Sequence, residues 1–136
     1  MSESIVRRFN GIRWHDSELL GLSVDRAGSE DQVKLSLQLL EGDALTPATV
    51  TFRECVYVEA QVYLQAKQMC ADAISDAECY SSSDWKNAVS EPSPYDPIRG
   101  DRQFEHYLHF QIGLCAPGGT INILAKDFVL ASAAPA

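Results

Sequence analysis

The chain has 136 residues, 46% of them hydrophobic, and a formal net charge of −8 from 11 Lys and Arg against 19 Asp and Glu. A length near the modal domain size, with a globular composition, predicts one domain over residues 1–136 and excludes an intrinsically disordered chain. The acidic balance argues against a nucleic-acid backbone or an anionic membrane as partner, and it permits a basic protein partner.

Three strands are predicted in the first part of the chain, because apolar and polar residues alternate there with a period of two. The alternation covers residues 19–26 and 33–39, and a third, threonine-rich stretch covers residues 49–53. Since the connections between these segments are short, we expect an antiparallel meander.

One main helix is predicted next, over about residues 58–75. Its apolar face is wide, so we expect it to be well buried. Its start is open, because residues 55–63 also suit a β-strand and the third strand could continue to Val58. The polar residues step by four, three, four and four positions along one stripe of this helix; they are Gln61, Gln65, Gln68, Asp72 and Asp76.

The longest strand is predicted from Phe104 to Leu114, where alternation is most regular. This register puts His106 on the apolar face as a buried neutral imidazole, and His109 on the polar face. The sequence APGG then predicts a hairpin turn. The remaining expectations are a return strand through Ile121 and Ile123, a short last strand over residues 128–130 and a frayed tail over residues 131–136.

Together these elements predict an α+β fold, in which a curled antiparallel sheet of five to six strands packs on one main helix. One helix cannot cover both faces of such a sheet, so its outer face should be polar. The positions expected on this outer face are Lys34, Ser36, Gln38, Thr49, Thr51, Arg53, Glu105 and Gln111.

The four cysteines are Cys55, Cys70, Cys79 and Cys115, and their gaps of 15, 9 and 36 residues contain no C-x-x-C motif. Zinc knuckles and thioredoxin-type sites are therefore not indicated. The N-terminal residues lack the apolar stretch of a signal peptide, and no apolar run approaches the ~18 residues of a membrane span. We expect reduced core thiols in a cytoplasmic protein that holds no metal and no cofactor.

A polar phrase, His15-Asp16-Ser17-Glu18, precedes the first predicted strand. In one interpretation His15 is a general base oriented by a neighbouring carboxylate. With His109, the phrase would then serve a small enzyme or a small-molecule-binding domain. Adjacent residues of an extended chain point in opposite directions, however, so adjacency does not build a triad. In the other interpretation Asp16 or Ser17 bonds the backbone ahead of the strand. No catalytic residue is assigned.

Residues 81–102 are predicted to form a long irregular loop, because three prolines and many serines exclude a regular element. Loops of this length in compact domains are disordered or functional. This one carries residue types that anchor protein interfaces, Trp85, Tyr95 and Arg99, beside acids such as Asp96. We expect them to bind a basic protein partner; the alternative is that Trp85 and Tyr95 only pin the loop to its own domain.

Three pieces of the sequence form a further pattern: an aromatic-H-D-S phrase leading into a strand at Trp14–Asp25, a T-x-x-F strand at Thr49–Phe52, and a strand at Gly119–Lys126. The pattern resembles small bacterial toxin-immunity proteins, in particular the immunity protein 50 family. The resemblance implies a cytoplasmic, acidic protein that binds and neutralises a toxin, and it assigns no catalytic residue. A homodimer, or a structural homo-oligomer without a ligand, stays open.

Overall fold

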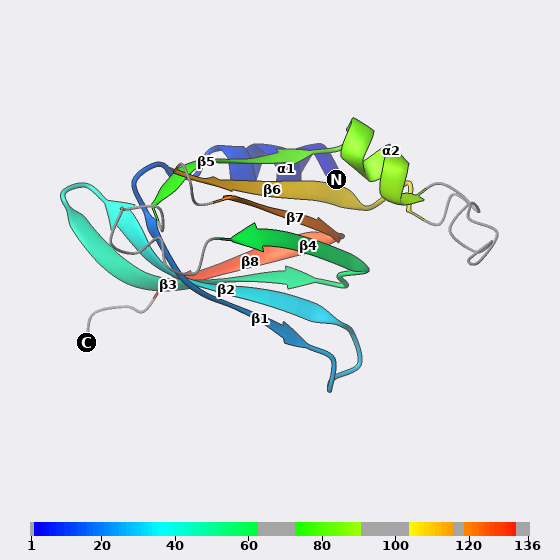
Figure 1. Cartoon of the computed structure of the whole chain (residues 1–136), viewed down its shortest axis with the longest axis horizontal. Helices are drawn as coiled ribbons and strands as arrows, with labels where there is room; N and C mark the ends of the chain where they lie inside the picture. Colours follow the sequence, from blue (N-terminus) through cyan, green and yellow to red (C-terminus); the bar gives the residue numbers. More distant parts are fainter. Residues whose placement is uncertain (1, 63–72, 91–103, 116–118, 133–136) are drawn as a thin grey trace.

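The computed structural model describes residues 2–62, 73–90, 104–115 and 119–132. Within these residues the chain forms two helices and eight strands (Figure 1). In chain order they are α1 (Ser2–Asn10), β1 (Glu18–Asp25), β2 (Gln32–Glu41), β3 (Ala44–Arg53), β4 (Tyr57–Val62), β5 (Ile74–Tyr80), α2 (Asp84–Ser90), β6 (Leu108–Leu114), β7 (Gly119–Ala125) and β8 (Asp127–Ser132).

The strands form two antiparallel sheets of four. The first sheet has the order β1-β2-β3-β8 and the second has the order β4-β7-β6-β5. The two sheets lie over one another as the layers of a β-sandwich (Figure 1). The expected α+β fold, with one sheet of five to six strands on one main helix, is therefore wrong.

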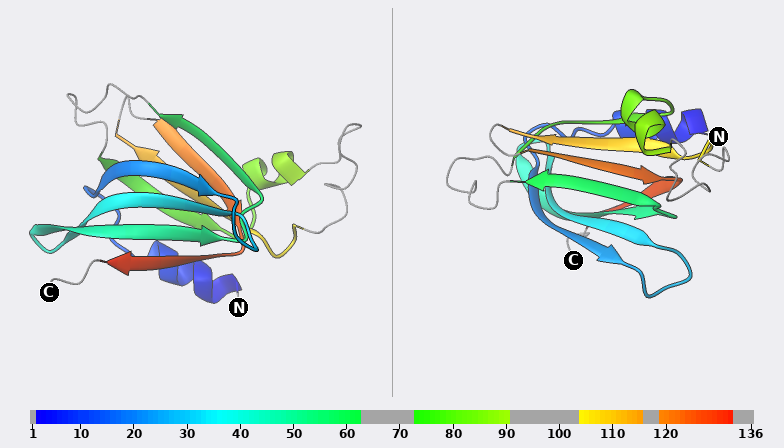
Figure 2. Two further views of the ribbon diagram at one scale, coloured as in Figure 1. Left: turned by 90° about the horizontal axis from the view of Figure 1, so that it is seen from below. Right: turned by 45° about the vertical axis from the view of Figure 1, so that its right-hand side comes forward.

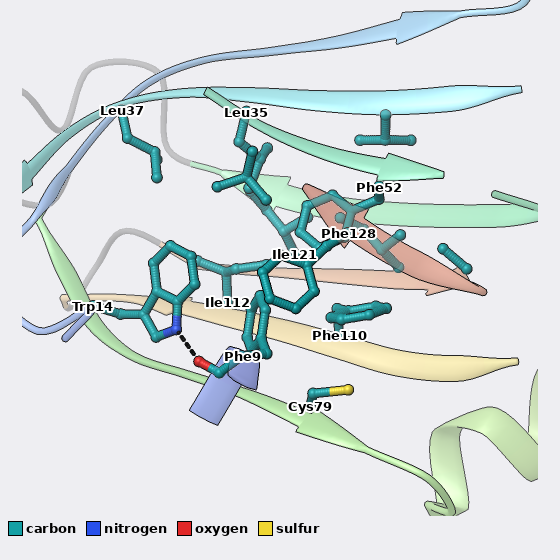
Figure 3. Packing of buried hydrophobic residues seen from close by; sticks show 14 of the residues in the cluster. Phe9, Trp14, Leu35, Leu37, Phe52, Cys79, Phe110, Ile112, Ile121 and Phe128 are labelled. Atoms are coloured by element: carbon teal, nitrogen blue, oxygen red, sulfur yellow. Dashed lines mark hydrogen bonds between the residues drawn. The ribbon is translucent and has the colours of Figure 1, made fainter. Parts of the chain in front are cut away.

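The hydrophobic core lies between the sheets and takes one face of each (Figure 3). The alternation predicted for β2 and β3 is confirmed, because every second side chain there is buried and the polar ones between them face outward. In β6 the residues from Phe110 to Leu114 alternate between buried and half-buried in the same way. The core residues with the least exposure include Leu35, Leu37, Phe52, Phe110, Ile112, Ile121, Ile123 and Phe128.

The helix expected over residues 58–75 is wrong wherever the structure describes that segment. β4 occupies its beginning and β5 starts at Ile74, while residues 63–72 lie outside the described part. Apolar residues also take every second position of β4, from Val58 to Val62. Antiparallel pairing with β7 stabilises this segment as a strand. Glu54, with φ of 49°, ends β3 and turns the chain toward the second sheet, so the third strand does not continue to Val58.

Helix α1 is not among the predicted elements. It packs against β5 and β8 and closes one side of the sandwich (Figure 2). Its Phe9 is fully buried. The Phe9 ring lies 4.7 Å from that of Trp14, 5.1 Å from that of Phe110 and 5.0 Å from that of Phe128, between centroids. Trp14 Nε1 donates to the Phe9 carbonyl at 2.9 Å (Figure 3). The helix is therefore part of the core.

The strand predicted from Phe104 begins only at Leu108. Ahead of it the chain turns, and the Tyr107 N–H donates to the Phe104 carbonyl at 3.0 Å. His106 is consequently exposed, so the prediction that it is a buried core histidine is wrong. Glu105 lies in the same turn rather than on the outer face of a strand.

Two boundaries also differ from expectation. Residues 84–90 form α2 inside the segment predicted to be wholly irregular, and residues 91–103 lie outside the described part. β8 runs to Ser132, so residues 131 and 132 belong to a strand rather than to a frayed tail. The short helix α2 is compatible with the sequence of residues 84–90, because the prolines of the segment predicted to be irregular begin only after Ser90.

Candidate functional site

The His15-Asp16-Ser17-Glu18 phrase forms a corner between the two sheets. His15 and Asp16 are exposed, with His15 Nε2 3.4 Å from Asp16 Oδ1, and His15 Nδ1 lies 2.8 Å from the Ser75 carbonyl oxygen. Asp16 has a positive φ of 68°, which Asp tolerates better than most residues. Its N–H donates to the Ile74 carbonyl at 3.0 Å. The phrase thus leads the chain past the start of β5 and into β1.

Ser17 is fully buried and acts as a structural link in this corner. Its hydroxyl accepts the Leu40 N–H from β2 at 2.9 Å, and its carbonyl accepts the Ile74 N–H at 2.7 Å. These bonds tie the first sheet to the second. They agree with the interpretation in which the phrase bonds the backbone around the strand.

His109 lies on the outer face of the second sheet and is only 2% exposed. Asn122 Oδ1 accepts a hydrogen bond from Gln111 Nε2 at 3.2 Å and lies 2.8 Å from His109 Nε2. Because a carbonyl oxygen can only accept, His109 carries its proton on Nε2 and donates it to Asn122. His109 Nδ1 then accepts from the Ser83 hydroxyl at 2.8 Å. Burial lowers the pKa of His109 from its ordinary value of 6.5, and the bond to Asn122 opposes this shift.

Helix α2 covers His109. The Trp85 ring stacks on the imidazole with centroids 4.3 Å apart. The Ser83 hydroxyl caps the helix by accepting the Lys86 N–H at 3.0 Å, and Lys86 Nζ donates to the Ser81 carbonyl at 2.9 Å. Burial lowers the pKa of Lys86. Trp85 therefore pins this segment to its own domain, the alternative left open by the sequence.

The structure does not bring the predicted polar residues into one site. His15 contacts Ser75 near the start of β5, whereas His109 of β6 is the register partner of Tyr80, the last residue of β5. Five residues along a strand span about 16 Å. Glu18 begins β1 near the same corner as His15. Of the residues predicted to bind a partner, Trp85 is described above, and Tyr95, Asp96 and Arg99 lie outside the described residues.

On one side of the sandwich, α1 forms hydrogen bonds to one residue at the edge of each sheet. The Asn10 side chain accepts the Cys79 N–H at 2.7 Å and donates to the Cys79 carbonyl at 3.2 Å, as a neighbouring strand would on β5. Arg8 Nη2 donates to the Phe128 carbonyl of β8 at 3.1 Å. Capping of this kind keeps an edge strand from pairing with another chain.

On the opposite side, the described residues cover only one end of β1, where Glu18 forms a single bridge with Ala73. β1 ends the first sheet and β4 ends the second, away from α1 (Figure 2). We call this surface the β1–β4 side. Across the strands Leu22 pairs with Leu35 and Val24 pairs with Val33, so all four side chains belong to the inner face.

The apolar residues of β1 are nevertheless exposed. Leu35 and Val33 are each 1% exposed, whereas Leu22 is 40% and Val24 is 49% exposed. A hollow of ≈ 280 Å³ adjoins Val24, and its other lining residues include Val33, Val56 and Val58. The β1–β4 side is therefore an open apolar margin of the core.

Carboxylates accompany this apolar margin. Glu18 and Asp25 stand at the two ends of β1. Arg26 follows directly, and its Nε lies 3.7 Å from Asp31 Oδ2. Within the described part of this strand and the turn after it, acidic groups thus outnumber basic ones, in keeping with the charge of the whole chain. The alternation of residues 19–26 predicts β1 but does not indicate that this strand lies at the edge of its sheet.

The cysteines that the structure describes are free thiols. Cys55 and Cys79 are buried, as predicted, and burial raises the pKa of Cys55 to about 11 and that of Cys79 to about 12. Such thiols are protonated at neutral pH and react slowly. Cys115 is partly buried, and Cys70 lies outside the described residues.

The described residues contain no group of three or more His, Cys, Asp or Glu that could hold a metal ion. In the same part of the chain, no helix is both long enough and apolar enough to cross a bilayer. In comparisons with known proteins, no family, no curated protein and no solved structure matches this chain.

Proposed function

We propose that this chain is a non-enzymatic protein-binding domain, an immunity-like cytoplasmic protein that neutralises a basic partner by occluding it. The β1–β4 side is the surface that we assign to the partner. The exposure of Leu22 and Val24 carries the proposal, because both residues belong by register to the core face of the first sheet. Contiguous exposed apolar surface of this kind is typical of interaction sites.

Charge supports a basic partner. The chain carries a net charge of −8, and Glu18 and Asp25 flank the apolar part of β1. Opposite charge on a partner speeds the encounter and adds specificity, and this contribution weakens as salt screens it. The participation of Tyr95, Asp96 and Arg99 in the same interface stays a prediction.

A small enzyme is the second candidate, and one observation favours it. Ser83, His109 and Asn122 are hydrogen-bonded in series, the order of a nucleophile, a base and an orienting group. Against it, the Ser83 hydroxyl is engaged as the cap of α2, and the His109 ring lies beneath Trp85. We therefore prefer the binding function.

The test is affinity capture from a lysate of the source organism, with the full chain as bait. Val24→Asp places a charge on the β1–β4 side. Val129→Asp is the matched control, because Val129 is 48% exposed on β8, the other edge of the first sheet. Both substitutions add one negative charge at a half-exposed valine. A thermal melt of each variant checks that it is folded, so a difference in capture between two folded variants reports position rather than charge.

The proposal predicts that the wild type and the Val129→Asp variant retain one basic protein in stoichiometric amount at low salt. The Val24→Asp variant should lose it, and raising the salt from about 50 mM to about 300 mM should weaken its retention. Equal retention by both variants would remove the β1–β4 side from the account. Absence of any stoichiometric protein from the wild-type capture would remove the binding function.

A further inference from the structure

We propose that the partner binds by adding a β-strand to the free edge of β1 at Gly21–Asp25, through an extended segment with alternating apolar residues and basic ends. This inference rests on the proposed function and specifies how the β1–β4 side is used. It is carried by three features of β1: its backbone edge, its inner-face side chains and its charges.

The backbone edge of β1 is free only over part of its length. At the N-terminal end, Glu18 forms an antiparallel bridge with Ala73, and a register shift follows between Leu19 and Gly21. From Gly21 to Asp25 the strand is regular and pairs with β2 on one side. No other strand of the described chain lies on its second side. Half of the backbone groups of an edge strand point away from its sheet and can bond an added strand.

The side chains of this stretch favour an apolar segment. Leu22 and Val24 face the inner layer, so an antiparallel added strand would place every second residue beside them. The hollow next to Val24 is also lined by Val56 and Val58, which offer those residues apolar contact. Addition of a strand to a sheet edge takes its affinity from main-chain bonds and its specificity from the alternate side chains.

The charges favour a basic segment over a second copy of this chain. Asp25 stands at one end of the free stretch and Glu18 stands beyond the other. The neighbouring Arg26 and Asp31 lie 3.7 Å apart and offset one another, so the remaining charge at the two ends is acidic. A second copy would bring together two chains that each carry −8. Like charge of this size opposes self-association, whereas Lys or Arg at the ends of a partner strand would neutralise the acids.

The test uses a labelled synthetic peptide of the same length as β1, eight residues. It has Val at alternate positions, Thr between them and Lys at both ends. One control peptide carries Glu in place of Lys. A second carries N-methyl groups on alternate backbone amides, in two versions that differ in phase, which removes the amide donors and keeps the side chains. Binding to the full chain is measured by fluorescence anisotropy, and the contact is located by amide shifts in NMR spectra.

Strand addition predicts that the Lys peptide binds and shifts the amides of Gly21–Asp25. One phase of N-methylation should weaken binding by about tenfold or more, the effect of losing roughly 1.4 kcal/mol, and the other phase should have little effect. The Glu peptide should bind about tenfold more weakly at low salt. The Val24→Asp variant should lose the Lys peptide and Val129→Asp should keep it.

Several results would overturn the inference while leaving the proposed function intact. They are equal binding by both N-methyl phases, shifts at another surface, or no binding of the Lys peptide up to about 1 mM. Slow exchange of the Gly21–Asp25 amides in the free monomer would show that the chain covers its own edge. A wild-type dimer that Val24→Asp dissociates would assign the edge to a second copy. If the wild-type chain captured no basic protein from the lysate, by contrast, that result would overturn the proposed function itself.

Discussion

Replacing Phe9 by Ala tests whether α1 is part of the core. Phe9 is fully buried, and its ring packs against those of Trp14, Phe110 and Phe128. Truncation to Ala removes roughly 150 Å² of buried apolar surface, which at about 25 cal/mol per Å² corresponds to about 4 kcal/mol. Measured Phe→Ala substitutions in cores cost about 3–5 kcal/mol, in agreement with this figure.

The assay is urea denaturation of the full chain together with a thermal melt. We expect the free energy of unfolding to fall by about 4 kcal/mol and the Tm to fall by roughly 12 °C. Arg7→Ala, an exposed position of the same helix, is the control and should change stability by less than about 0.5 kcal/mol. A loss below about 1 kcal/mol for Phe9→Ala would show that α1 does not close the sandwich.

Three further predictions concern the outer face and the capped edge. His109→Gln should flatten the pH dependence of stability. Burial lowers the pKa of His109 below 6.5 in the folded wild type, so the unfolded chain takes up the proton at a higher pH than the folded chain does. The free energy of unfolding of the wild type therefore falls as the pH drops below about 6.5. Urea denaturation between about pH 7.5 and 5.5 measures this, and an unchanged slope would contradict it. Trp85→Ala should cost about 2 kcal/mol, because the ring covers His109, whereas the exposed Asn87→Ala on the same helix should cost almost nothing; equal melting temperatures would refute the packing of α2. Asn10→Ala should cost about 1–2 kcal/mol and speed exchange of the Cys79 amide, since it removes both side-chain bonds to β5. Unchanged exchange there would contradict the capping.

Local pattern predicts β1, β2 and β3, whereas β4 and β5 fall where the pattern predicts a helix. In β2 every second residue from Val33 to Leu39 is apolar, and these residues are buried as that pattern requires. Helix α1 was also predictable, because Ile5 and Phe9 share a face, Glu3 stands in the first turn and Gly11 follows the last. Such elements depend only on residues close together in the sequence.

The division into two sheets is not encoded locally in the same way. The chain leaves the first sheet at Glu54, whose backbone is left-handed although its residue type rarely adopts this conformation, so no turn signal marks this change of sheet. It returns to the first sheet between β7 and β8. Because no sequence signal shows that a new strand begins after Glu54, the polar residues Gln61 and Asp76 fit one stripe of a helix as well as they fit two separate strands.

The candidate sites illustrate the same limit. The register that puts His109 opposite the core face is predictable, but its burial depends on α2, which packs over it from a distant segment. The exposure of Leu22 and Val24 is likewise invisible in the alternation of β1. It arises because β1 lies at the edge of its sheet and α1 covers the other side.

The central claim, that the β1–β4 side binds a basic partner, is tested most directly by hydrogen exchange of the full chain, free and in complex with the captured partner. The account predicts that binding slows exchange of the Gly21–Asp25 amides and leaves those of β8 and α2 unchanged. Slowed exchange confined to α2 and residues 91–103, with β1 unaffected, would contradict it.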